Sequence, residues 1–422
     1  MNKFNNGINA DSENEEFGET EHIAGERTRH RDTHISFHFR PSGEVTLDGL
    51  SGKTAKERRR QQATKIIFLG ASIEALGQNR WIHYSRNKNA YTGQKRYRGK
   101  EYTYALVPSA VDCLEELGVI EHQRAFPCAP MAGSYGYQSR FRLVPDAGLI
   151  LPKYCCDPFE TVRLKDASKR LVDYPETDRT LRMRRETYEI NEALCSIEIE
   201  LESEACVRRG PHIFCQTGNL DDNLQPKCVV INPARNSVYR VFSNGKWNLG
   251  GRLYGGWWQN VPSSERTNIH IDGFATVEED YQQLHPRLLY HFVDKEPIGD
   301  AYTIDGWDRP LCKRSFNIAI NARTEFAAIG AIQNLVGGPG ARECATKLLG
   351  AIKNHHRPIE RFFHTGIGLT LQHIDSQMAS HVVRSMLKQG IVCLPIHDSF
   401  IVRAGNQSQL LEVMEEAYCC VI

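Results

Sequence analysis

The sequence contains no apolar run long enough to cross a membrane, and its first residues lack the apolar core of a signal peptide. These absences predict a cytoplasmic protein with no membrane partner. The 13 cysteines include no C-x-x-C pair, which disfavours a zinc ribbon or a redox motif and favours buried, reduced thiols. A P-loop, G-x-x-x-x-G-K followed by Ser or Thr, is also missing, and this disfavours a metabolic phosphotransferase.

Net charge is nearly absent as well, because 52 Lys and Arg oppose 51 Asp and Glu and leave a formal charge of +1. An anionic partner must therefore be bound by local patches and not by the field of the whole molecule. The length of 422 residues, with 41% hydrophobic and 24% charged residues, is typical of a globular protein of two or three domains.

Acidic residues are absent from the stretch NRWIHYSRNKNAYTGQKRYRGK, residues 79–100, which holds seven Lys and Arg with four Trp and Tyr between them. Cations interleaved with aromatic rings suit phosphate contacts and base stacking. A solvated loop is the alternative interpretation. The candidate nucleic-acid-binding residues in this stretch are Arg86, Lys95, Arg96, Arg98 and Lys100.

Composition and turn signals divide the chain into four parts. The first is polar and predicts disorder. The second holds a helix, a strand, a loop and another strand, a pattern that resembles a winged helix. The four parts are a disordered tail (1–45), a winged-helix-like nucleic-acid-binding domain (46–150), a connecting region (151–246) and a C-terminal domain (247–422).

The connecting region contains one long amphipathic pattern over residues 178–198. We expect a helix there, with Leu181, Tyr188 and Leu194 toward one side. The arginines at positions 182, 184 and 185 either meet a nucleic-acid backbone or form a solvated face, and the pattern favours neither.

The segment LGGRLYGGWWQNVP, residues 249–262, combines paired glycines with an arginine and several aromatic residues. Paired glycines let the backbone approach a ligand or another strand closely. Arg252 is therefore suited to contact a nucleic-acid backbone, although a Gly-rich hairpin explains the pattern without any ligand.

Two carboxylates stand at the ends of predicted strands. Asp280 ends a strand that follows a hairpin turn at Asp272-Gly273, and the alternative for it is a helix N-cap. Asp398 stands in VCLPIHDSFIV, residues 392–402, which predicts two buried strands joined by a tight turn. If both carboxylates reach one spot, they can hold two Mg²⁺ ions about 3.5–4 Å apart, the spacing used for in-line phosphoryl transfer.

A third segment, WDRPLCKRSFNIAINARTEFAAIGAI, residues 307–332, predicts a helix with Pro310 in its first turn. Polar side chains recur every four residues and so share one face of this helix. A cationic face of this kind stabilises the charge of a triphosphate and its leaving pyrophosphate, whereas an ordinary exposed face is the alternative. The candidate nucleotide-binding residues on it are Arg309, Lys313, Asn317 and Asn321.

These segments, in this order, resemble the palm and fingers of family A DNA polymerases and phage-type single-subunit RNA polymerases. The resemblance covers residues 247–415. DYQQLHPRLLYHF is similar to their first metal motif and LPIHDSF to their last, which implies Asp280 and Asp398 as ligands of two Mg²⁺ ions. His397 would then lie beside the primer end and act with them in catalysis.

The other matching segments add substrate contacts. RPLCKRSFNIAINA is similar to the fingers helix, which implies a catalytic triphosphate role for Lys313 and a supporting role for Arg309. GGRLY resembles a template-contacting element, and DSQMASH resembles the segment before the last metal motif. We therefore include Arg252, Tyr254 and Gln377 among the expected nucleic-acid contacts.

The sequence also departs from the family pattern. The fingers helix of the family carries a Tyr where this chain has Asn321, and the RNA polymerases carry a His where it has Asp375. Five residues after the first metal-binding Asp, the DNA polymerases have a Glu that excludes a ribose 2′-hydroxyl, and the RNA polymerases have a small residue. This chain has His285 there, and its bulk favours dNTP.

The resemblance implies an α+β protein with a polymerase right-hand fold, in which an antiparallel palm sheet and helical fingers follow a thumb-like region and a winged-helix-like unit. We expect a template-directed nucleotidyltransferase, with a DNA polymerase of DNA or mobile-element replication favoured. Its partners would be a DNA template and primer, or nascent RNA, with dNTP or NTP and accessory replication proteins. The alternatives are a DNA-directed RNA polymerase or primase and, in another class, a non-catalytic DNA-binding initiator or regulator.

Overall fold

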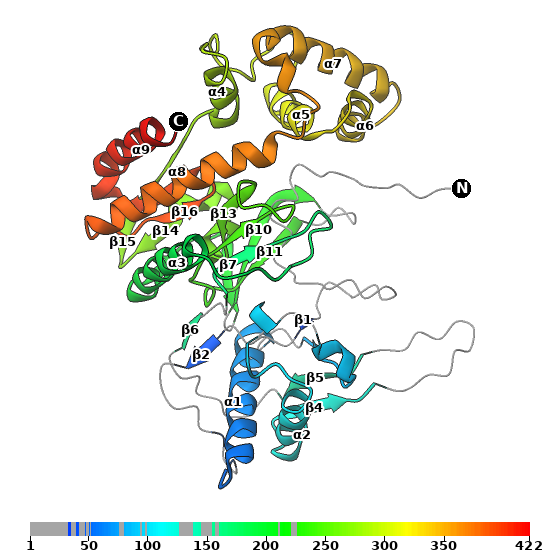
Figure 1. The fold of residues 1–422 in the computed structure, drawn as a ribbon, viewed down its shortest axis with the longest axis vertical. Helices are drawn as coiled ribbons and strands as arrows, with labels where there is room; N and C mark the ends of the chain where they lie inside the picture. Colours follow the sequence, from blue (N-terminus) through cyan, green and yellow to red (C-terminus); the bar gives the residue numbers. More distant parts are fainter. Residues whose placement is uncertain are drawn as a thin grey trace.

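The structure is a computed structural model that describes residues 33–34, 39–41, 47, 50, 52–75, 80–92, 95–97, 99–125, 138–144, 154–156, 160–209, 212–220 and 226–422. It combines helices with largely antiparallel sheets, which confirms the α+β class (Figure 1). Within the described residues, no helix has the length and apolar character needed to span a membrane.

A five-stranded antiparallel sheet lies at the centre of the C-terminal part. Its strands, in spatial order, are β16 (Leu394–Ile396), β17 (Ser399–Arg403), β15 (Phe274–Asp280), β14 (Ile269–Ile271) and β8 (Ile199–Leu201). The turn between β14 and β15 has φ values of 50° at Asp272 and 75° at Gly273, as the predicted two-residue hairpin requires. A second tight hairpin joins β16 to β17 at His397, where φ is 56°.

Helix α8 connects this sheet to a second one. The second sheet has the order β13 (Gly250–Tyr254), β12 (Tyr239–Phe242) and β7 (Val162–Leu164). α8 (Gly368–Lys388) packs along β13 and also contacts β16 and α9 (Gln407–Val421). One apolar core joins the central sheet to β13, α8 and α9 and buries Trp257, Trp258 and Phe400, so these elements are fixed relative to one another. The buried apolar residues of β7 and β12 belong to a second, smaller core.

α3 (Asp178–Ser196) forms where a helix was expected, but it buries a different face. Leu181 and Tyr188 are 51% and 57% exposed, so the prediction that they share a buried side with Leu194 is wrong. The buried positions include Met183, Ile190 and Leu194, which are spaced seven and four residues apart. Polar Thr187 and Asn191 complete this face, and their polarity explains why an apolar pattern alone misplaced it.

A group of helices stands at one end of the central sheet (Figure 1). It consists of α4 (Leu284–His291), α5 (Arg309–Asn321), α6 (Glu325–Val336) and α7 (Ala341–His355). The predicted start of α5 is confirmed: Asp308 caps it by accepting the Leu311 N–H at 2.9 Å, and Pro310 lies in its first turn.

The N-terminal unit has its own apolar core beneath two helices, α1 (Ala55–Ala75) and α2 (Val107–Glu116). Its sheet has the order β1 (Thr33–His34), β3 (Ile82–His83), β5 (Arg140–Leu143) and β4 (Ile120–Gln123). Two short 3₁₀ turns, Lys88–Tyr91 and Lys95–Tyr97, lie between β3 and α2. The predicted helix and the two predicted strands over 107–143 are therefore confirmed, with another helix and strand before them, whereas residues 126–137 of the predicted loop lie outside the described residues.

Part of the expected N-terminal tail forms regular structure. β1 pairs with β3, and β2 (Phe39–Pro41) pairs with β6 (Tyr154–Cys156). The prediction of disorder is therefore wrong for these residues, because both segments gain backbone hydrogen bonds from strands far along the chain. The rest of 1–45 lies outside the described residues.

Ionic contacts at two residues, Arg96 and Glu74, fasten the N-terminal unit to the rest of the molecule. Arg96 contacts Glu160 at 3.2 Å and also pairs with Asp173 and Glu176, while Arg184 of α3 contacts the same Glu160 at 2.9 Å. On α1, Glu74 accepts a hydrogen bond from Arg235 at 2.7 Å. The unit is thus held by buried and partly buried charges and not by a linker alone.

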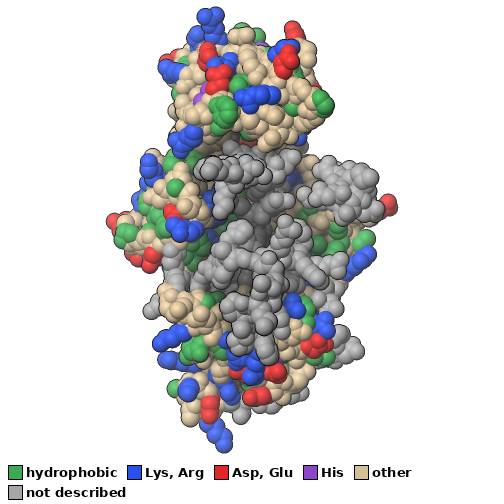
Figure 2. Space-filling model, turned by 90° about the vertical axis from the view of Figure 1, so that its right-hand side faces the viewer, with side chains coloured by type: hydrophobic (Ala, Val, Ile, Leu, Met, Phe, Trp, Pro, Cys, Tyr) green, Lys and Arg blue, Asp and Glu red, His purple; other side chains and the backbone are tan. Residues whose placement is uncertain are grey.

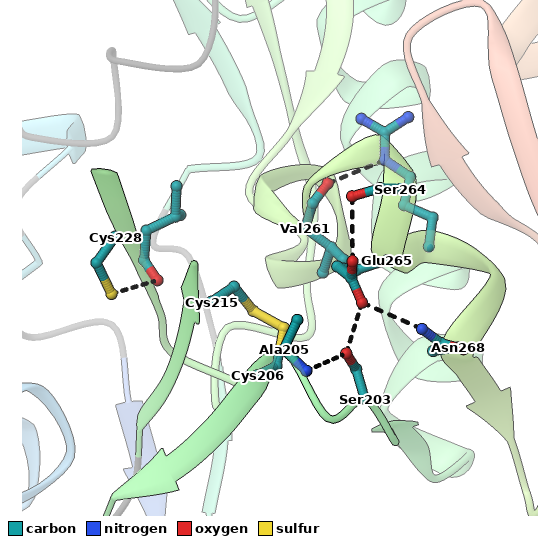
Figure 3. Close-up of a disulfide and its surroundings, with 11 residues drawn as sticks. Ser203, Ala205, Cys206, Cys215, Cys228, Val261, Ser264, Glu265 and Asn268 are labelled. Atoms are coloured by element: carbon teal, nitrogen blue, oxygen red, sulfur yellow. Dashed lines mark hydrogen bonds between the residues drawn. A yellow bond between two sulfur atoms is a disulfide. The ribbon is translucent and has the colours of Figure 1, made fainter. Parts of the chain in front are cut away.

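A third sheet contains the one disulfide among the described residues. β9 (Cys206–Arg209), β10 (His212–Leu220) and β11 (Pro226–Ile231) pair in the order β11, β10, β9. Cys206 and Cys215 face each other across β9 and β10 and are bonded (Figure 3). The expectation of reduced thiols is therefore wrong for this pair, since cross-strand pairing brings two cysteines together that are nine residues apart in sequence.

Candidate functional site

Asp280 and Asp398 lie side by side, although 118 residues separate them in the sequence. Asp280 ends β15 directly opposite Ser399, the first residue of β17. The N–H of Tyr281 donates a hydrogen bond to the carbonyl oxygen of Asp398 at 3.1 Å. The helix that follows, α4, has Gln283 at its cap position, so the alternative role of Asp280 as an N-cap does not hold.

The electrostatics of Asp280 indicate that the two carboxylates interact. Partial burial of the carboxyl group raises the pKa of Asp280 above its usual range, and the charges of Asp398 and Glu278 raise it further. The charge of Lys313 acts in the opposite direction. A cation between the two carboxylates would relieve this repulsion.

Lys313 and Arg309 lie on the exposed side of α5, as the four-residue spacing predicts. Both stand over the ring of Tyr302, with the Lys313 Nζ 6.0 Å and the Arg309 Cζ 5.7 Å from its centroid. Arg309 is also paired with Asp300 at 2.7 Å. The charge of Lys313 acts on Asp280, whereas the charge of Arg309 is partly neutralised by Asp300.

Tyr302 is a residue of this site that sequence reasoning missed. Its ring is buried, packs edge-on against Phe316 of α5, and lies under the two cations. Burial and the charge of Asp398 raise the pKa of the Tyr302 hydroxyl. Tyr302 thus joins the cationic helix to the carboxylate pair, but it lies in an irregular segment whose sequence carries no periodic signal.

Asn317 and Asn321 occupy the expected face of α5, and they interact with each other. The Asn321 side-chain amide donates a hydrogen bond to the Asn317 carbonyl oxygen at 2.9 Å. Asn321 also lies against Gly368 at the start of α8, where a Cβ would come within 1.9 Å of its Oδ1. A larger residue at position 368 would require the Asn321 side chain to move, so Asn321 takes part in the contact between α5 and α8.

Arg252, Asp375 and His285 form a buried chain of polar contacts. Arg252 on β13 pairs with Asp375 on α8, with its Nη2 2.6 Å from Oδ2. The Nε2 of His285 lies 3.1 Å from the same oxygen. Arg252 is only 5% exposed, so its guanidinium serves this ion pair and does not face solvent as a template contact would. The carboxylate of Asp375 holds the His285 ring in place.

His397 and Tyr254 meet beside the carboxylates, with ring centroids 5.4 Å apart. Burial lowers the pKa of His397 to about 3, so its imidazole is neutral at physiological pH. Gln377, the remaining candidate nucleic-acid contact of this region, lies half-buried on α8. The structure therefore gathers Asp280, Asp398 and His397 around one hairpin.

The candidates in the N-terminal unit do not form one cationic surface. Arg86 is engaged with Asp112, and Arg96 is engaged with three carboxylates. Lys100 is exposed. Arg98 and the side chain of Lys95 lie outside the described residues. Charge composition alone could not reveal these ion pairs, because the acidic partners come from other segments.

Oxygen ligands suit Mg²⁺, and the neighbouring, interacting carboxylates of Asp280 and Asp398 fit this requirement. A second group of ligand atoms, from Asp112, Glu115 and His122, lies within 4.8 Å of one another in the N-terminal unit. Its carboxylates already contact Arg86 and Arg124. Those cations neutralise the carboxylates, and the group is explained as an ion-pair network.

No family model matches the chain, and a search of curated proteins gives no match. The chemistry of the site therefore has to be argued from its own residues. Two carboxylates, a lysine and a neutral histidine around a rigid hairpin can bind a divalent cation together with a phosphorylated substrate.

Proposed function

We propose that this protein is a template-directed nucleotidyltransferase that extends a 3′ end with nucleoside triphosphates. The observation that carries the proposal is the meeting of Asp280 and Asp398 on neighbouring strands, with Lys313 close enough to oppose the rise in the Asp280 pKa. The three residues come from three separate segments that each resemble a polymerase motif. Their proximity is what a shared function requires.

The arrangement of elements supports a right-hand polymerase fold. An antiparallel sheet with both carboxylates would be the palm, and the group α5 to α7 at one end of it would be the fingers (Figure 1). α3 would belong to the thumb-like region. The N-terminal unit, with its helices and β4–β5 hairpin, would be the winged-helix-like part.

Asp280 and Asp398 would hold two Mg²⁺ ions, since their mutual repulsion is what a divalent cation offsets. When bound, such ions supply Lewis-acid activation of the 3′-hydroxyl and neutralise the triphosphate. Lys313 would bind the triphosphate through its charge, and neutral His397 would pack beside the primer end without adding charge. His285, fixed by Asp375, would lie near the sugar and favour dNTP.

Two other functions remain as alternatives. An RNA polymerase or primase is favoured by the segment LPIHDSF, which resembles the RNA polymerases closely. A non-catalytic DNA-binding initiator or regulator would need only the N-terminal unit. That function would not explain why Asp280, Asp398 and Lys313 lie close together. A DNA template with primer is the partner expected for the favoured function, with accessory replication proteins.

A primer-extension assay tests the proposal and separates the alternatives. A labelled primer on a DNA template is incubated with Mg²⁺ and either dNTPs or NTPs, with and without the primer. Extension by dNTPs alone is expected for a DNA polymerase. Primer-free products from NTPs would assign an RNA polymerase or primase. Absence of product in every lane, with duplex binding intact, would contradict catalysis and favour the initiator.

A further inference from the structure

Two kinds of cation in the described part of the N-terminal unit differ in their partners, beside the exposed Lys88 and Lys100. The first kind is neutralised by carboxylates: Arg86 contacts Asp112, Arg124 contacts Asp112 and Glu115 at 3.2 and 3.1 Å, and Arg142 contacts Glu121 at 2.5 Å. These ion pairs hold the unit together. Such cations have little charge left to attract an anionic partner, because their fields are cancelled locally.

The second kind lies at the start of α1. Five cations occur within eight residues there: Lys53, Lys56, Arg58, Arg59 and Arg60. The first four are exposed and the last is half-buried. Among the described residues, no carboxylate forms an ion pair with any of them. We call this group the α1 basic cluster.

The single acidic residue in the cluster is used for capping. The carboxylate of Glu57 accepts the backbone N–H groups of Lys53 and Thr54 at 2.9 and 2.8 Å. Lys56 stands three and four residues before Arg59 and Arg60 and so shares a helix face with them. Like charges at these spacings destabilise a helix in isolation. A bound polyanion would remove this repulsion.

We propose that the α1 basic cluster binds the phosphate backbone of duplex nucleic acid. The exposed residues from Lys53 to Gln62 contain no aromatic ring for base stacking, which favours a duplex backbone over a single strand. They also contain no large apolar side chain for insertion into a lipid surface. The assignment moves the phosphate contact away from the stretch 79–100, in which Arg86 and Arg96 serve internal ion pairs, and it does not depend on polymerase activity.

The α1 basic cluster lies far from the candidate site. α1 begins at the end of the molecule opposite α6 and α7, and Figure 2 shows Lys and Arg side chains at that end (Figures 1 and 2). The contacts of Arg96 with Glu160 and of Arg235 with Glu74 fix the unit against the body. A duplex bound to the α1 basic cluster would therefore be held at a fixed position relative to the body, away from the Asp280 and Asp398 carboxylates.

The test is a binding titration of the full chain with a labelled duplex at several salt concentrations. The variant Arg58→Gln/Arg59→Gln/Arg60→Gln removes three charges from exposed or half-exposed positions and keeps side chains that favour a helix. The slope of log K against log salt is expected to fall by about 2 to 3, because each lost phosphate contact lowers it by about 0.9. The matched control, Lys295→Gln/Arg357→Gln/Lys388→Gln, removes three exposed charges elsewhere and is expected to leave the slope unchanged.

Three outcomes would overturn the proposal. The first is an unchanged slope in the cluster variant. The second is an equal loss in the control, which would mean that only overall charge matters. The third is a lower slope in Lys88→Gln/Lys100→Gln, a change of two exposed cations in the stretch 79–100, while the slope of the cluster variant stays at the wild-type value. In parallel titrations, the full chain must bind a single strand and anionic vesicles more weakly than it binds the duplex. Because only binding is measured, a failure of catalysis would not affect the result.

Discussion

Tyr302 is the side chain that links the two halves of the candidate site. Its ring lies under Lys313 and Arg309, and its hydroxyl is influenced by Asp398. A buried aromatic face beneath two cations restricts where those cations can move. We infer that Tyr302 keeps Lys313 directed toward the phosphates of a nucleotide bound near the carboxylates.

Replacing Tyr302 by Leu is expected to raise the KM for the nucleotide about 5- to 30-fold, since each exposed cation–π contact contributes about 0.5–1 kcal/mol and the two together contribute about 1–2 kcal/mol. The change is measured by steady-state extension kinetics. Tyr290→Leu is the control, because Tyr290 is also buried but hydrogen-bonds His356 instead of lying under these cations. Equal KM changes in both variants would indicate a general packing effect.

His356 predicts a pH dependence of stability. It is buried, its ring nitrogens lie 2.8 Å from the Ala301 carbonyl oxygen and 3.3 Å from the Tyr290 hydroxyl, and burial lowers its pKa from 6.5 to about 4. As pH falls, the imidazole of residue 356 is therefore protonated at a higher pH in the unfolded chain than in the folded protein. Stability should be full above pH 6.5 and decline toward pH 4, by about 3 kcal/mol at most.

Thermal unfolding of the wild type and of His356→Gln between pH 7 and pH 4 measures this effect. The variant lacks the titrating group, so its unfolding midpoint should be lower at pH 7 but should fall less steeply with pH. Parallel curves for the two proteins would show that His356 is not responsible.

At the scale of helices and strands, the contact between β13 and α8 depends on a buried ion pair. Arg252 and Asp375 are both nearly inaccessible and contact each other at 2.6 Å. Removing one partner of such a pair leaves the other as a buried, uncompensated charge, which is strongly destabilising. Asp375 of this pair also positions His285, so breaking the ion pair would also disturb the candidate site.

Asp375→Asn is expected to lower the free energy of unfolding by about 3–5 kcal/mol, measured by urea denaturation. Glu343→Gln, which breaks the exposed pair of Glu343 with Lys347 on α7, should leave the midpoint unchanged. A double variant, Arg252→Met/Asp375→Leu, should recover much of the loss because no unpaired charge remains. No recovery in this variant would contradict the explanation.

The sequence predicted elements well where periodicity and turn chemistry agree. The Asp272-Gly273 hairpin, the turn at Asp398 and the start of α5 after Asp308 all follow local rules, and the structure has them. The buried face of α3 was misplaced because Thr187 and Asn191 face the core through hydrogen bonds. Tyr302 and the partners of Arg96 could not be predicted, since they depend on contacts between distant segments.

At the scale of the whole molecule, a group of ion pairs attaches the N-terminal unit to the body. Arg184 and Arg96 hydrogen-bond Glu176 and lower its pKa to about 2, and both arginines also contact Glu160. A carboxylate whose pKa is depressed on folding stabilises the folded state above its unfolded pKa of 4.5. This contribution is lost as pH falls from there toward 2.

Small-angle scattering at pH 6 and pH 3 tests this attachment. The radius of gyration should rise at pH 3, because much of the stabilisation from the contacts of Glu176 is lost as pH falls from 4.5 toward 2. Glu160→Gln/Glu176→Gln should show part of that rise already at pH 6. Glu189→Gln, a change at an exposed position of α3, is the control. A radius that stays constant in all three proteins would show that apolar contacts alone hold the unit.

The central claim is that Asp280 and Asp398 act as a pair in nucleotide transfer. It is tested most directly by primer extension with Asp280→Asn and Asp398→Asn, beside Glu279→Gln as the control. Glu279 neighbours Asp280 but points to the opposite face of β15, where it accepts a hydrogen bond from Gln407 at 2.6 Å. We predict that each Asp variant loses activity at least about 100-fold, while the control stays near wild type. Extension that survives in both Asp variants would contradict the account.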